Sequence, residues 1–532
     1  MSKFKTGLLL VQHIKHQNIH SVLKEVSQLV EKKLYIDFQQ SFLKKPSSAG
    51  DAQIERNEYF NLLSMVYSRP KELCSQLEMQ VLLPPCIKAN DPRKVKQPID
   101  ILFVADQNSS NNLIELVVKE ITCSNDVVLK VIGENEYVNQ DSTKYQFDFS
   151  KLYSGVVIGG TFDRIHDGHK LLIQTALLLG EEKLTVGVAD GPLLEKKIVK
   201  ELIEPVDQRI ENVIQLIDES KPGIEHKVVP ITDPCGPSGT DDDLQLLLVS
   251  EETIKGGPLV NQERQKNGLP QLDVMNIELV GESSTDLSES LNAEGKVSSS
   301  AARVRELGRL LREPNRPLED GKCYVIGVTG GIASGKSSIV KRFEQMGAFT
   351  VDCDLLGHRA YNPGEMAYKK VVEEFGSHIL NEDGTINRRK LGPIVFADKR
   401  KLELLNSIVW PEIHKMKQDI IDEVSREGKH KIVVFEGAVL FEAGWDKEAN
   451  EVWCCVIPKH EAVQRIMDRN KLSEEEALKR IASQMSNEER VSKSHVVLST
   501  LWERDFTQKQ CEKAWKLLNE RISLGTKPLS SL

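Results

Sequence analysis

Short apolar runs alternate with longer amphipathic segments along most of the 532 residues. In the first 150 residues, the spacing of apolar positions predicts a helix in SVLKEVSQLVEKK (Ser21–Lys33). Buried strands are predicted in DILFVAD (Asp100–Asp106) and VVLKVIG (Val127–Gly133), on either side of a helical NNLIELVVKEI. Residues 1–150 are therefore predicted to form an α/β region. Nothing there has a catalytic spacing, so we expect a scaffold, targeting or regulatory role.

The same alternation continues in two further blocks, residues 151–311 and 322–525. Their strand candidates are SGVVIGG, KLTVGVAD, HKVVPI and NIELV in the first block, and CYVIGVTG, GAFTVDCD, KIVVFEGAVL and EVWCCVIP in the second. Strands that alternate with helices predict βαβ units and parallel sheets. The polar, proline-bearing REPNRPLEDG (residues 312–321) is predicted to link the two blocks, and residues 526–532 to form a tail.

Composition narrows the class of protein. The chain is too long for one hydrophobic core, and 40% hydrophobic with 28% charged residues is typical of a soluble globular protein. The net charge of -9 argues against an enzyme that binds nucleic acid by neutralising its phosphates. The nine cysteines are scattered without metal-type spacing, which predicts a reduced, intracellular protein. No apolar run is long enough for a transmembrane segment.

The N-terminus carries lysines and no acidic residue before Glu25. Such a start resembles a mitochondrial targeting sequence, apart from its lack of arginine. His13, His16 and His20 would share a helix face there. Because no carboxylate or cysteine lies beside them, we interpret them as an ordinary exposed face rather than a metal site.

The string GGTFDRIHDGH (Gly159–His169) lies between a strand candidate and a helix candidate. Gly159 and Gly160 allow the backbone to approach a ligand closely. His166 and His169 are predicted to lie at or beside the helix N-terminus, where free amides and the helix dipole favour an anion. Two imidazoles there could stabilise the charge that grows on a phosphate during attack. The alternative is a glycine turn followed by two solvated histidines.

A second string, VSSSAAR (Val297–Arg303), follows in the same block. Taken alone, a serine run before an arginine is typical of a capped helix. Together with GGTFDRIHDGH, it resembles the H-x-G-H nucleotidyltransferase superfamily, which has a Rossmann-like fold and joins a phosphate-bearing substrate to the α-phosphate of a nucleoside triphosphate. The resemblance implies ATP contacts by Gly159, Gly160, Thr161, Phe162, His169, Ser298, Ser299, Ser300 and Arg303.

Two further segments resemble the eukaryotic and archaeal type of phosphopantetheine adenylyltransferase. They are VSEETIKGGPLVNQERQKNGL (Val249–Leu269) and GVADGPLLEKK, in which Lys196 or Lys197 could meet the substrate phosphate. The resemblance implies that His166 and His169 stabilise the transition state at the α-phosphate. The phosphate of 4′-phosphopantetheine is already ionised and is itself the nucleophile, so catalysis needs only positioning and charge stabilisation.

The third block contains a complete G-x-x-x-x-G-K-[ST] motif, preceded by a strand candidate and followed by a helix candidate. Backbone amides would hold the triphosphate, Lys336 would bridge its β- and γ-phosphates, and Ser337 would hold Mg²⁺. A GTPase is excluded because the D-x-x-G string at Asp354 follows Lys336 by only 18 residues and no N-K-x-D string is present. The predicted ATP loop comprises Gly330, Gly331, Ile332, Ala333, Ser334, Gly335, Lys336, Ser337 and Ser338.

The string VDCDLLGH (Val351–His358) resembles the D-x-D segment of dephospho-CoA kinases. The resemblance implies that Asp354 ends a strand and acts as base for the acceptor hydroxyl, whereas the alternative is a carboxylate that caps the next helix. Trp410 stands where that family usually has histidine. The further matching strings are GTINRRKLG, LNSIVWPEI, AVLFEAGWD and RIASQMSNEER.

Three arginines lie on two predicted helices around a short break: Arg465, Arg469 and Arg480. This arrangement suits a lid that closes basic side chains over the phosphoryl group in transfer. A solvated helical hairpin with Glu–Arg pairs is the alternative. Arg480 is the favoured catalytic arginine because it lies within RIASQMSNEER.

The two blocks together resemble the bifunctional coenzyme A synthases of animals, over roughly residues 150–525. The resemblance implies ATP and Mg²⁺ as cofactors, 4′-phosphopantetheine and dephospho-CoA as small-molecule partners, and a cytoplasmic and mitochondrial location. Residues 1–150 could dock a mitochondrial membrane surface or a protein. The alternatives are a nicotinamide-mononucleotide adenylyltransferase fused to a riboside kinase, and a nucleotide-binding scaffold or sensor without turnover.

Overall fold

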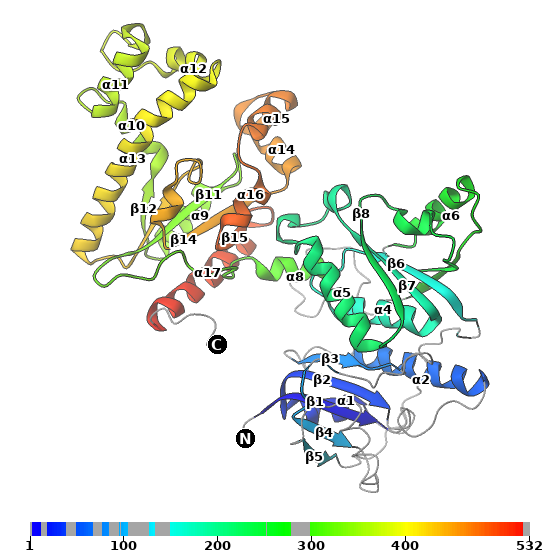
Figure 1. Ribbon diagram of the computed structural model, residues 1–532. Coiled ribbons are helices and arrows are strands. Elements are labelled where there is room, and N and C mark those ends of the chain that lie inside the picture. The colour runs from blue at the N-terminus through cyan, green and yellow to red at the C-terminus, as the bar shows by residue number, and fades with distance from the viewer. Residues whose placement is uncertain are drawn as a thin grey trace. The chain divides into compact units, whose positions relative to one another are not determined.

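The computed structural model describes residues 3–11, 19–38, 49–67, 77–83, 95, 97–104, 127–132, 149, 151–251, 253–277 and 298–524. Three five-stranded parallel sheets form the architecture, which confirms the predicted fold class (Figure 1). The chain divides into two compact units, Met1–Ala302 and Arg303–Leu532. The predicted helix NNLIELVVKEI, His13, His16 and the tail lie outside the described residues.

The first sheet has the strand order β3-β2-β1-β4-β5. The helix predicted over residues 21–33 is wrong in its second half, because α1 ends at Ser27 and β2 begins at Val30. Leu34, Tyr35 and Ile36 are fully buried in a strand paired on both sides, and burial and strand pairing outweigh the helical spacing. The elements are β1 (Phe4–Val11), α1 (Ile19–Ser27), β2 (Val30–Phe38), α2 (Ala49–Tyr67), β3 (Glu78–Val81), β4 (Ile101–Val104) and β5 (Val128–Val131).

The second sheet has the order β10-β9-β6-β7-β8, with β6 at its centre. The strand predictions at SGVVIGG, KLTVGVAD and HKVVPI are confirmed. The strands are β6 (Tyr153–Gly160), β7 (Gly180–Ala189), β8 (Glu225–Ile231), β9 (Leu246–Ser250) and β10 (Asp273–Ile277). The helices are α4 (Asp167–Leu179), α5 (Val206–Ser220), α6 (Gly256–Lys266) and α8 (Ser299–Glu306), with short 3-10 helices η4 (Gly191–Leu194), η5 (Lys200–Leu202) and η6 (Gly236–Gly239).

One hydrophobic core spans the first two sheets, and buried polar contacts join them. In α4, the fully buried Gln174 accepts a hydrogen bond from Tyr67 (2.8 Å) and donates to the Val81 carbonyl (2.6 Å). Lys33 of β2 pairs with Glu219 of α5 at 2.8 Å. The N-terminal region is therefore packed directly on the helices of the second sheet.

The third sheet has the order β12-β13-β11-β14-β15, with β11 at its centre. Its strands are β11 (Tyr324–Gly330), β12 (Phe349–Asp352), β13 (Ile432–Glu436), β14 (Glu451–Val456) and β15 (Val496–Ser499). The α-helices are α9 (Lys336–Gln345), α10 (Cys353–Ala360), α11 (Met366–Phe375), α12 (Arg388–Phe396), α13 (Lys399–Glu427), α14 (Lys459–Asn470), α15 (Glu474–Ala482), α16 (Asn487–Lys493) and α17 (Arg504–Leu524). The 3-10 helices are η7 (Ser377–Ile379) and η8 (Trp445–Glu448).

The proline-bearing segment expected to be a linker lies on the C-terminal unit. The Leu311 amide donates to His495 O (2.7 Å), and the Asn315 amide donates to Asn450 O (2.8 Å). The boundary between the two compact units falls between Ala302 and Arg303 in the sequence, within α8. In the described part of the chain, no helix has the length and apolar character needed to span a bilayer.

Candidate active sites

The H-x-G-H string connects the central strand of the second sheet to a helix. β6 ends at Gly160, and His166 is the N-cap of α4. The rings of His166 and His169 stack with their centroids 3.8 Å apart and an interplanar angle of 20°. The buried Phe162 packs on His169, with ring centroids 5.2 Å apart. Both imidazoles therefore lie where the free amides of α4 favour an anion.

The electrostatics of this pair favour an incoming negative charge. Burial lowers the pKa of His169 well below its usual value, and the positive charges of His166 and Lys197 lower it further. The Nδ1 atom of His169 has no hydrogen-bond partner among the residues that the structure describes. A phosphate would supply both the countercharge and the partner that this imidazole lacks.

The loop before the histidines is held in a strained conformation. Phe162 and Arg164 both have φ of 49°, in the left-handed region that non-glycine residues rarely adopt. The Asp163 carboxylate is fully buried and accepts hydrogen bonds from Arg164 Nη1 (3.1 Å) and the Glu204 amide (3.0 Å). Strain of this kind persists only where surrounding contacts enforce it, and it is typical of functional sites.

Arg209 of α5 holds the same loop through its backbone carbonyls. This residue was not predicted from the sequence. Its guanidinium is 1% exposed and donates to the carbonyls of Thr161, Ala189 and Glu204, each at 2.8 Å. It also pairs with Asp190 at 3.1 Å. A sequence signal does exist, because Arg209 shares the buried face of α5 with apolar residues four, seven and eight positions later.

The serine string lies beside the first histidine, although 133 residues separate Ser299 from His166. Ser299 Oγ donates to Asp163 O (2.9 Å) and lies 3.5 Å from His166 Nε2. Ser298 Oγ accepts from the Ala301 amide at the start of α8. Arg303 is buried and Ser300 half-buried. The fold thus brings the hydroxyl of the second string to the histidines of the first.

The remaining predicted residues of this site differ in their surroundings. Lys197 is exposed and close enough to His169 to depress its pKa, and Lys196 is exposed beside it. A Cβ added to Gly160 would lie 3.2 Å from the Phe162 ring, whereas one on Gly159 would lie 3.9 Å from its nearest neighbour, Gly187 O. Only the Gly159 side therefore leaves room for close approach by a ligand.

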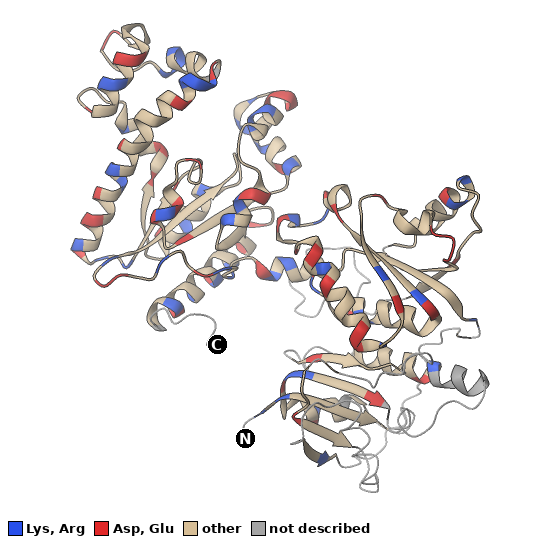
Figure 2. Ribbon diagram, viewed as in Figure 1, with Lys and Arg blue, Asp and Glu red and all other residues tan. Residues whose placement is uncertain are grey.

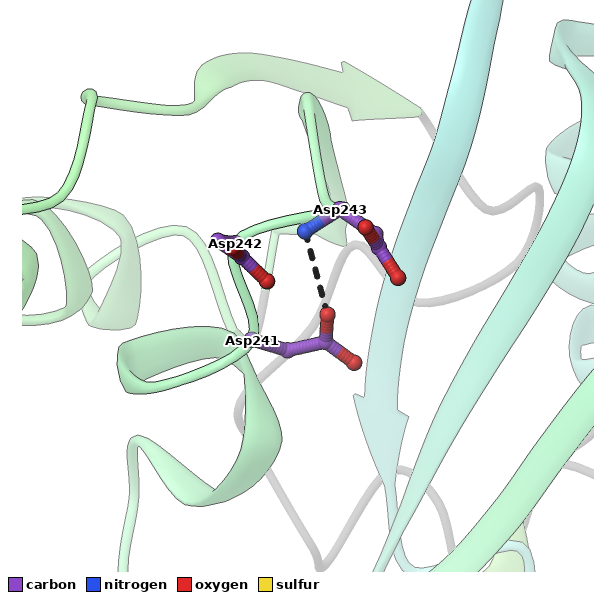
Figure 3. Close-up of side chains that lie close together, drawn as sticks. All are labelled: Asp241, Asp242 and Asp243. Atoms are coloured by element: carbon purple, nitrogen blue, oxygen red, sulfur yellow. Dashed lines mark hydrogen bonds between the residues drawn. The ribbon is translucent and has the colours of Figure 1, made fainter.

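An acidic cluster at the opposite end of this sheet is partly balanced by lysine. Figure 3 shows Asp241, Asp242 and Asp243, whose carboxylates lie within 4.8 Å of one another. Lys183 contacts both Asp241 and Asp243 at 3.1 Å. Because Lys183 and Asp243 lie near the amino ends of β7 and β9, the cluster is remote from the carboxyl end of β6, where the histidines lie.

The glycine-rich loop of the third sheet runs from β11 into α9 as predicted. Gly335 has φ of 89°, and a Cβ there would lie 2.7 Å from the Thr500 side chain, so only glycine fits. Lys336 Nζ donates to the carbonyls of Gly330 (3.0 Å) and Gly331 (3.1 Å). Burial lowers the pKa of Lys336. The lysine therefore lies over the loop that would hold the phosphates.

Glu436 is a second functional candidate that sequence reasoning missed. It is the last residue of β13, and its Oε1 accepts a hydrogen bond from Ser337 Oγ at 2.8 Å. Burial raises the pKa of this carboxyl. A hydroxyl and a carboxylate at this distance form the oxygen donor set that suits Mg²⁺ beside a P-loop. The available signal was an acidic residue at the end of an apolar strand, at the ligand-binding edge of a parallel sheet.

The structure corrects the position predicted for Asp354. Asp352, not Asp354, ends β12, and its carboxylate caps α10 by accepting from the amides of Asp354 (2.8 Å) and Leu355 (3.1 Å). Asp354 lies in the first turn of α10, because the strand ends and the helix begins two residues earlier than the strand pattern predicts. Burial and the charge of Asp352 raise the pKa of Asp354, while Lys336 opposes that rise.

The predicted lid arginines fall into two groups. Arg465 of α14 is bound to Glu461 (2.7 Å) and to the hydroxyl and carbonyl of Thr500 (2.8 and 2.7 Å), which makes it a structural tie. Arg469 and Arg480 are exposed. Figure 2 shows charges of both signs on α14 and α15. Residues of both helices also pack against Ile332 and Ala333, so the hairpin covers one side of the P-loop.

Trp410, at the position where a histidine is usual, lies within α13 and packs partly buried against the hydrophobic core of the C-terminal unit. Its contacts there are those of a core side chain. The structure thus gives Trp410 a packing role.

The fold and the two sites define an ATP-dependent phosphotransferase joined to a nucleotidyltransferase-like domain. Residues 324–501 match the family model of dephospho-CoA kinase, and residues 157–305 match the cytidylyltransferase-like family model. The chain belongs to the dephospho-CoA kinase family and is a transferase in which that kinase domain is fused to a cytidylyltransferase-like domain.

Curated relatives support this placement. The dephospho-CoA kinase of Syntrophus aciditrophicus is 36% identical over 211 residues, which cover 40% of this chain and 90% of the relative. That of Carboxydothermus hydrogenoformans is 41% identical over 186 residues, which cover 35% of this chain and 90% of the relative. The structure of dephospho-CoA kinase from Campylobacter jejuni is 26% identical with a TM-score of 0.30, and the match covers 37% of this chain and 97% of that chain.

Proposed function

We propose that this chain is a bifunctional coenzyme A synthase. Its first reaction transfers AMP from ATP to 4′-phosphopantetheine and gives dephospho-CoA and pyrophosphate. Its second phosphorylates the ribose 3′-hydroxyl of dephospho-CoA and gives CoA and ADP. The observation that carries the proposal is that an H-x-G-H site shares one chain with a domain of the dephospho-CoA kinase family. The product of the first reaction would be the substrate of the second.

In the first reaction, a phosphate oxygen of 4′-phosphopantetheine attacks the α-phosphorus of ATP, and pyrophosphate leaves. His166, His169 and the first amides of α4 donate hydrogen bonds to the oxygens on which charge accumulates. Ser299 positions His166, and Arg209 holds the loop that carries both groups. No protein nucleophile is needed, because the attacking phosphate is already ionised.

In the second reaction, Asp354 accepts the proton of the 3′-hydroxyl as its oxygen attacks the γ-phosphorus. The raised pKa of Asp354 suits it to this proton transfer. Lys336 leaves the loop carbonyls and binds the β- and γ-phosphates. Ser337 and Glu436 would hold Mg²⁺, which supplies charge neutralisation on the same oxygens when it is bound.

Single-site variants separate the two reactions. Full-length protein is incubated with ATP, Mg²⁺ and 4′-phosphopantetheine, and the products are resolved by mass spectrometry. Lys336→Ala should accumulate dephospho-CoA without CoA, and His169→Ala should stop the sequence before dephospho-CoA while leaving the phosphorylation of added dephospho-CoA intact. Lys341→Ala, an exposed lysine on the same helix α9, is the matched control and should behave as wild type. Loss of CoA without any dephospho-CoA in Lys336→Ala would contradict the proposal.

A further inference from the structure

A buried guanidinium beside the P-loop has unfilled hydrogen-bonding capacity. Arg490 of α16 is 1% exposed. Its Nη1 donates to the Met485 carbonyl, but Nε and Nη2 have no hydrogen-bond partner in the described part of the chain. Buried donors without partners cost about 1–3 kcal/mol each, more when charged. Such a group indicates a ligand that completes it.

The guanidinium of Arg490 faces the first turn of the P-loop. A Cβ added to Gly331 would lie 3.8 Å from Arg490 Nη1 and 4.0 Å from Gln484 Oε1. The Ile332 amide donates to that same Gln484 oxygen at 2.8 Å. Gln484 and Arg490 therefore lie beside the first residues of the loop, with the Arg490 guanidinium next to Gly331.

The buried Arg490 and the half-buried P-loop lysine are two cations beside the same residue of the loop. Lys336 Nζ is 3.1 Å from the Gly331 carbonyl, on the residue that Arg490 also approaches. Two like charges close together in a partly desolvated place repel one another, and a bound anion between them removes that cost.

The ion pair with Glu442 does not satisfy the hydrogen-bonding capacity of Arg490. Glu442 Oε1 lies 3.8 Å from Nη2, beyond hydrogen-bond distance, and the Glu442 side chain is 31% exposed. The contrast with Arg465 is direct, because Glu461 and Thr500 engage that guanidinium at 2.7–2.8 Å. Of these two arginines, only Arg490 retains donors for a ligand.

We propose that Arg490 binds the γ-phosphate of ATP and holds it during transfer. The inference rests on the proposed kinase reaction. In that step the bond between the γ-phosphorus and the β–γ bridging oxygen breaks, the bond to the ribose 3′-oxygen forms, and the hydroxyl proton passes to Asp354. Arg490 presents two N–H groups to the equatorial oxygens of the moving phosphoryl group, a geometry that an ammonium cannot reproduce. Arg490 is thus a catalytic residue, and Glu442 competes with ATP for it.

The test compares Arg490→Lys and Arg490→Gln with wild type in the full chain. The matched control is Arg504→Gln, an exposed arginine at the start of α17. We measure kcat with dephospho-CoA and the affinities for ATP and ADP, both with Mg²⁺. Removing one preorganised charge stabiliser of this type lowers kcat by about 10²–10³-fold. Affinity for ATP should fall toward that for ADP, while ADP affinity stays unchanged, since only ATP carries the γ-phosphate.

Each outcome has a distinct meaning. If wild-type protein does not phosphorylate dephospho-CoA, the proposed kinase reaction fails. If wild type is active and Arg490→Lys keeps both its kcat and its preference for ATP over ADP, the inference about Arg490 is overturned. If the Arg490 variants do not fold, Glu442→Gln decides, because this half-exposed change leaves the buried charge in place. It should raise the preference for ATP over ADP severalfold, and an unchanged or lower preference would overturn the inference.

Discussion

The Lys33–Glu219 pair offers a quantitative test of how the N-terminal region is attached. Lys33 Nζ lies 2.8 Å from Glu219 Oε2 and 3.3 Å from Glu78 Oε1, and the Lys33 and Glu219 side chains are 6% and 3% exposed. Burial alone would lower the pKa of Lys33, but the charges of Glu78 and Glu219 outweigh it and raise the pKa. The perturbation is Lys33→Met, which keeps the length of the side chain and removes the charge.

The expected cost follows from what the substitution leaves behind. Glu219 retains a hydrogen bond from Gln215 (3.1 Å) but loses its buried cation. Breaking one partner of a buried pair costs about 3–5 kcal/mol, whereas replacing both partners by apolar residues is often neutral. Lys33→Met/Glu219→Met should therefore recover most of the loss. Because the pKa of Lys33 is raised, its contribution is complete below the unfolded-state value of about 10.4 and is lost only above the folded-state pKa, so the cost stays constant from about pH 7 to 9.

Hydrogen exchange in the full-length protein measures this cost. All five tryptophans lie between residues 410 and 515, so their fluorescence reports only the C-terminal unit and provides an internal control. Amides of β2 and α5 should exchange a few hundred- to a few thousand-fold faster in Lys33→Met, since about 1.4 kcal/mol corresponds to tenfold. Lys32→Met, at an exposed position on the same strand, is the matched control. Equal exchange in Lys33→Met and Lys32→Met, or a double variant no more stable than the single, would refute the reasoning.

Three further predictions concern the two sites. Asp354→Asn should lower the kcat of dephospho-CoA phosphorylation by about 10²–10⁴-fold with little change in ATP affinity, because only the base is lost. An Asn variant as active as wild type in a steady-state assay would contradict the role of Asp354 as the base. In the free protein, His169 should become protonated only well below pH 6.5, and bound ATP should raise its pKa. An NMR titration of His169 with a midpoint near 6.5 in the absence of ATP would contradict its buried position. Arg209→Lys should destabilise the Met1–Ala302 unit by about 2–4 kcal/mol, because one ammonium cannot satisfy the four acceptors of the Arg209 guanidinium. The same variant should slow adenylyl transfer more than phosphorylation. Equal effects on the two half-reactions would contradict the role given to Arg209.

The parts of both sites that are local in sequence could be predicted from it. The P-loop lies between β11 and α9 because one short string determines the turn, the amides and the lysine together. The two histidines stack at the start of α4 for the same reason, because a spacing of three residues at the start of a helix places two side chains on the same side. The strand pattern also predicted the parallel sheets. These features depend on residues that are close to one another in the sequence, so local motifs and spacing are enough to predict them.

The residues that sequence reasoning missed depend on tertiary contacts. Arg209, Glu436 and Arg490 each reach their loops from elements far along the chain, and no string of letters marks those approaches. The error over Ser21–Lys33 has the same origin, because β2 becomes a strand through its pairing with β1 and β3. Asp354 lies in the first turn of α10 rather than at the end of β12, because the strand ends two residues earlier and Asp352 caps the helix.

The first sheet packs on α4 and α5 and so holds the helix that carries the two histidines. Gln174 and Lys170 follow His169 on the same helix, and Lys170 donates to the Met79 carbonyl at 2.7 Å. The helix that presents the histidines is therefore anchored along its length by the first sheet. We therefore propose that the described strands of the first sheet position the helix that carries the histidines.

The most direct test of the central claim is a choice between substrates. Purified full-length protein receives ATP, Mg²⁺ and either 4′-phosphopantetheine or nicotinamide mononucleotide, and the products are identified by mass. We expect CoA from 4′-phosphopantetheine, with dephospho-CoA appearing first, and no dinucleotide from nicotinamide mononucleotide. A dinucleotide from the second substrate with nothing from the first would contradict the assignment of the H-x-G-H site, and no product from either would indicate a nucleotide-binding protein without turnover.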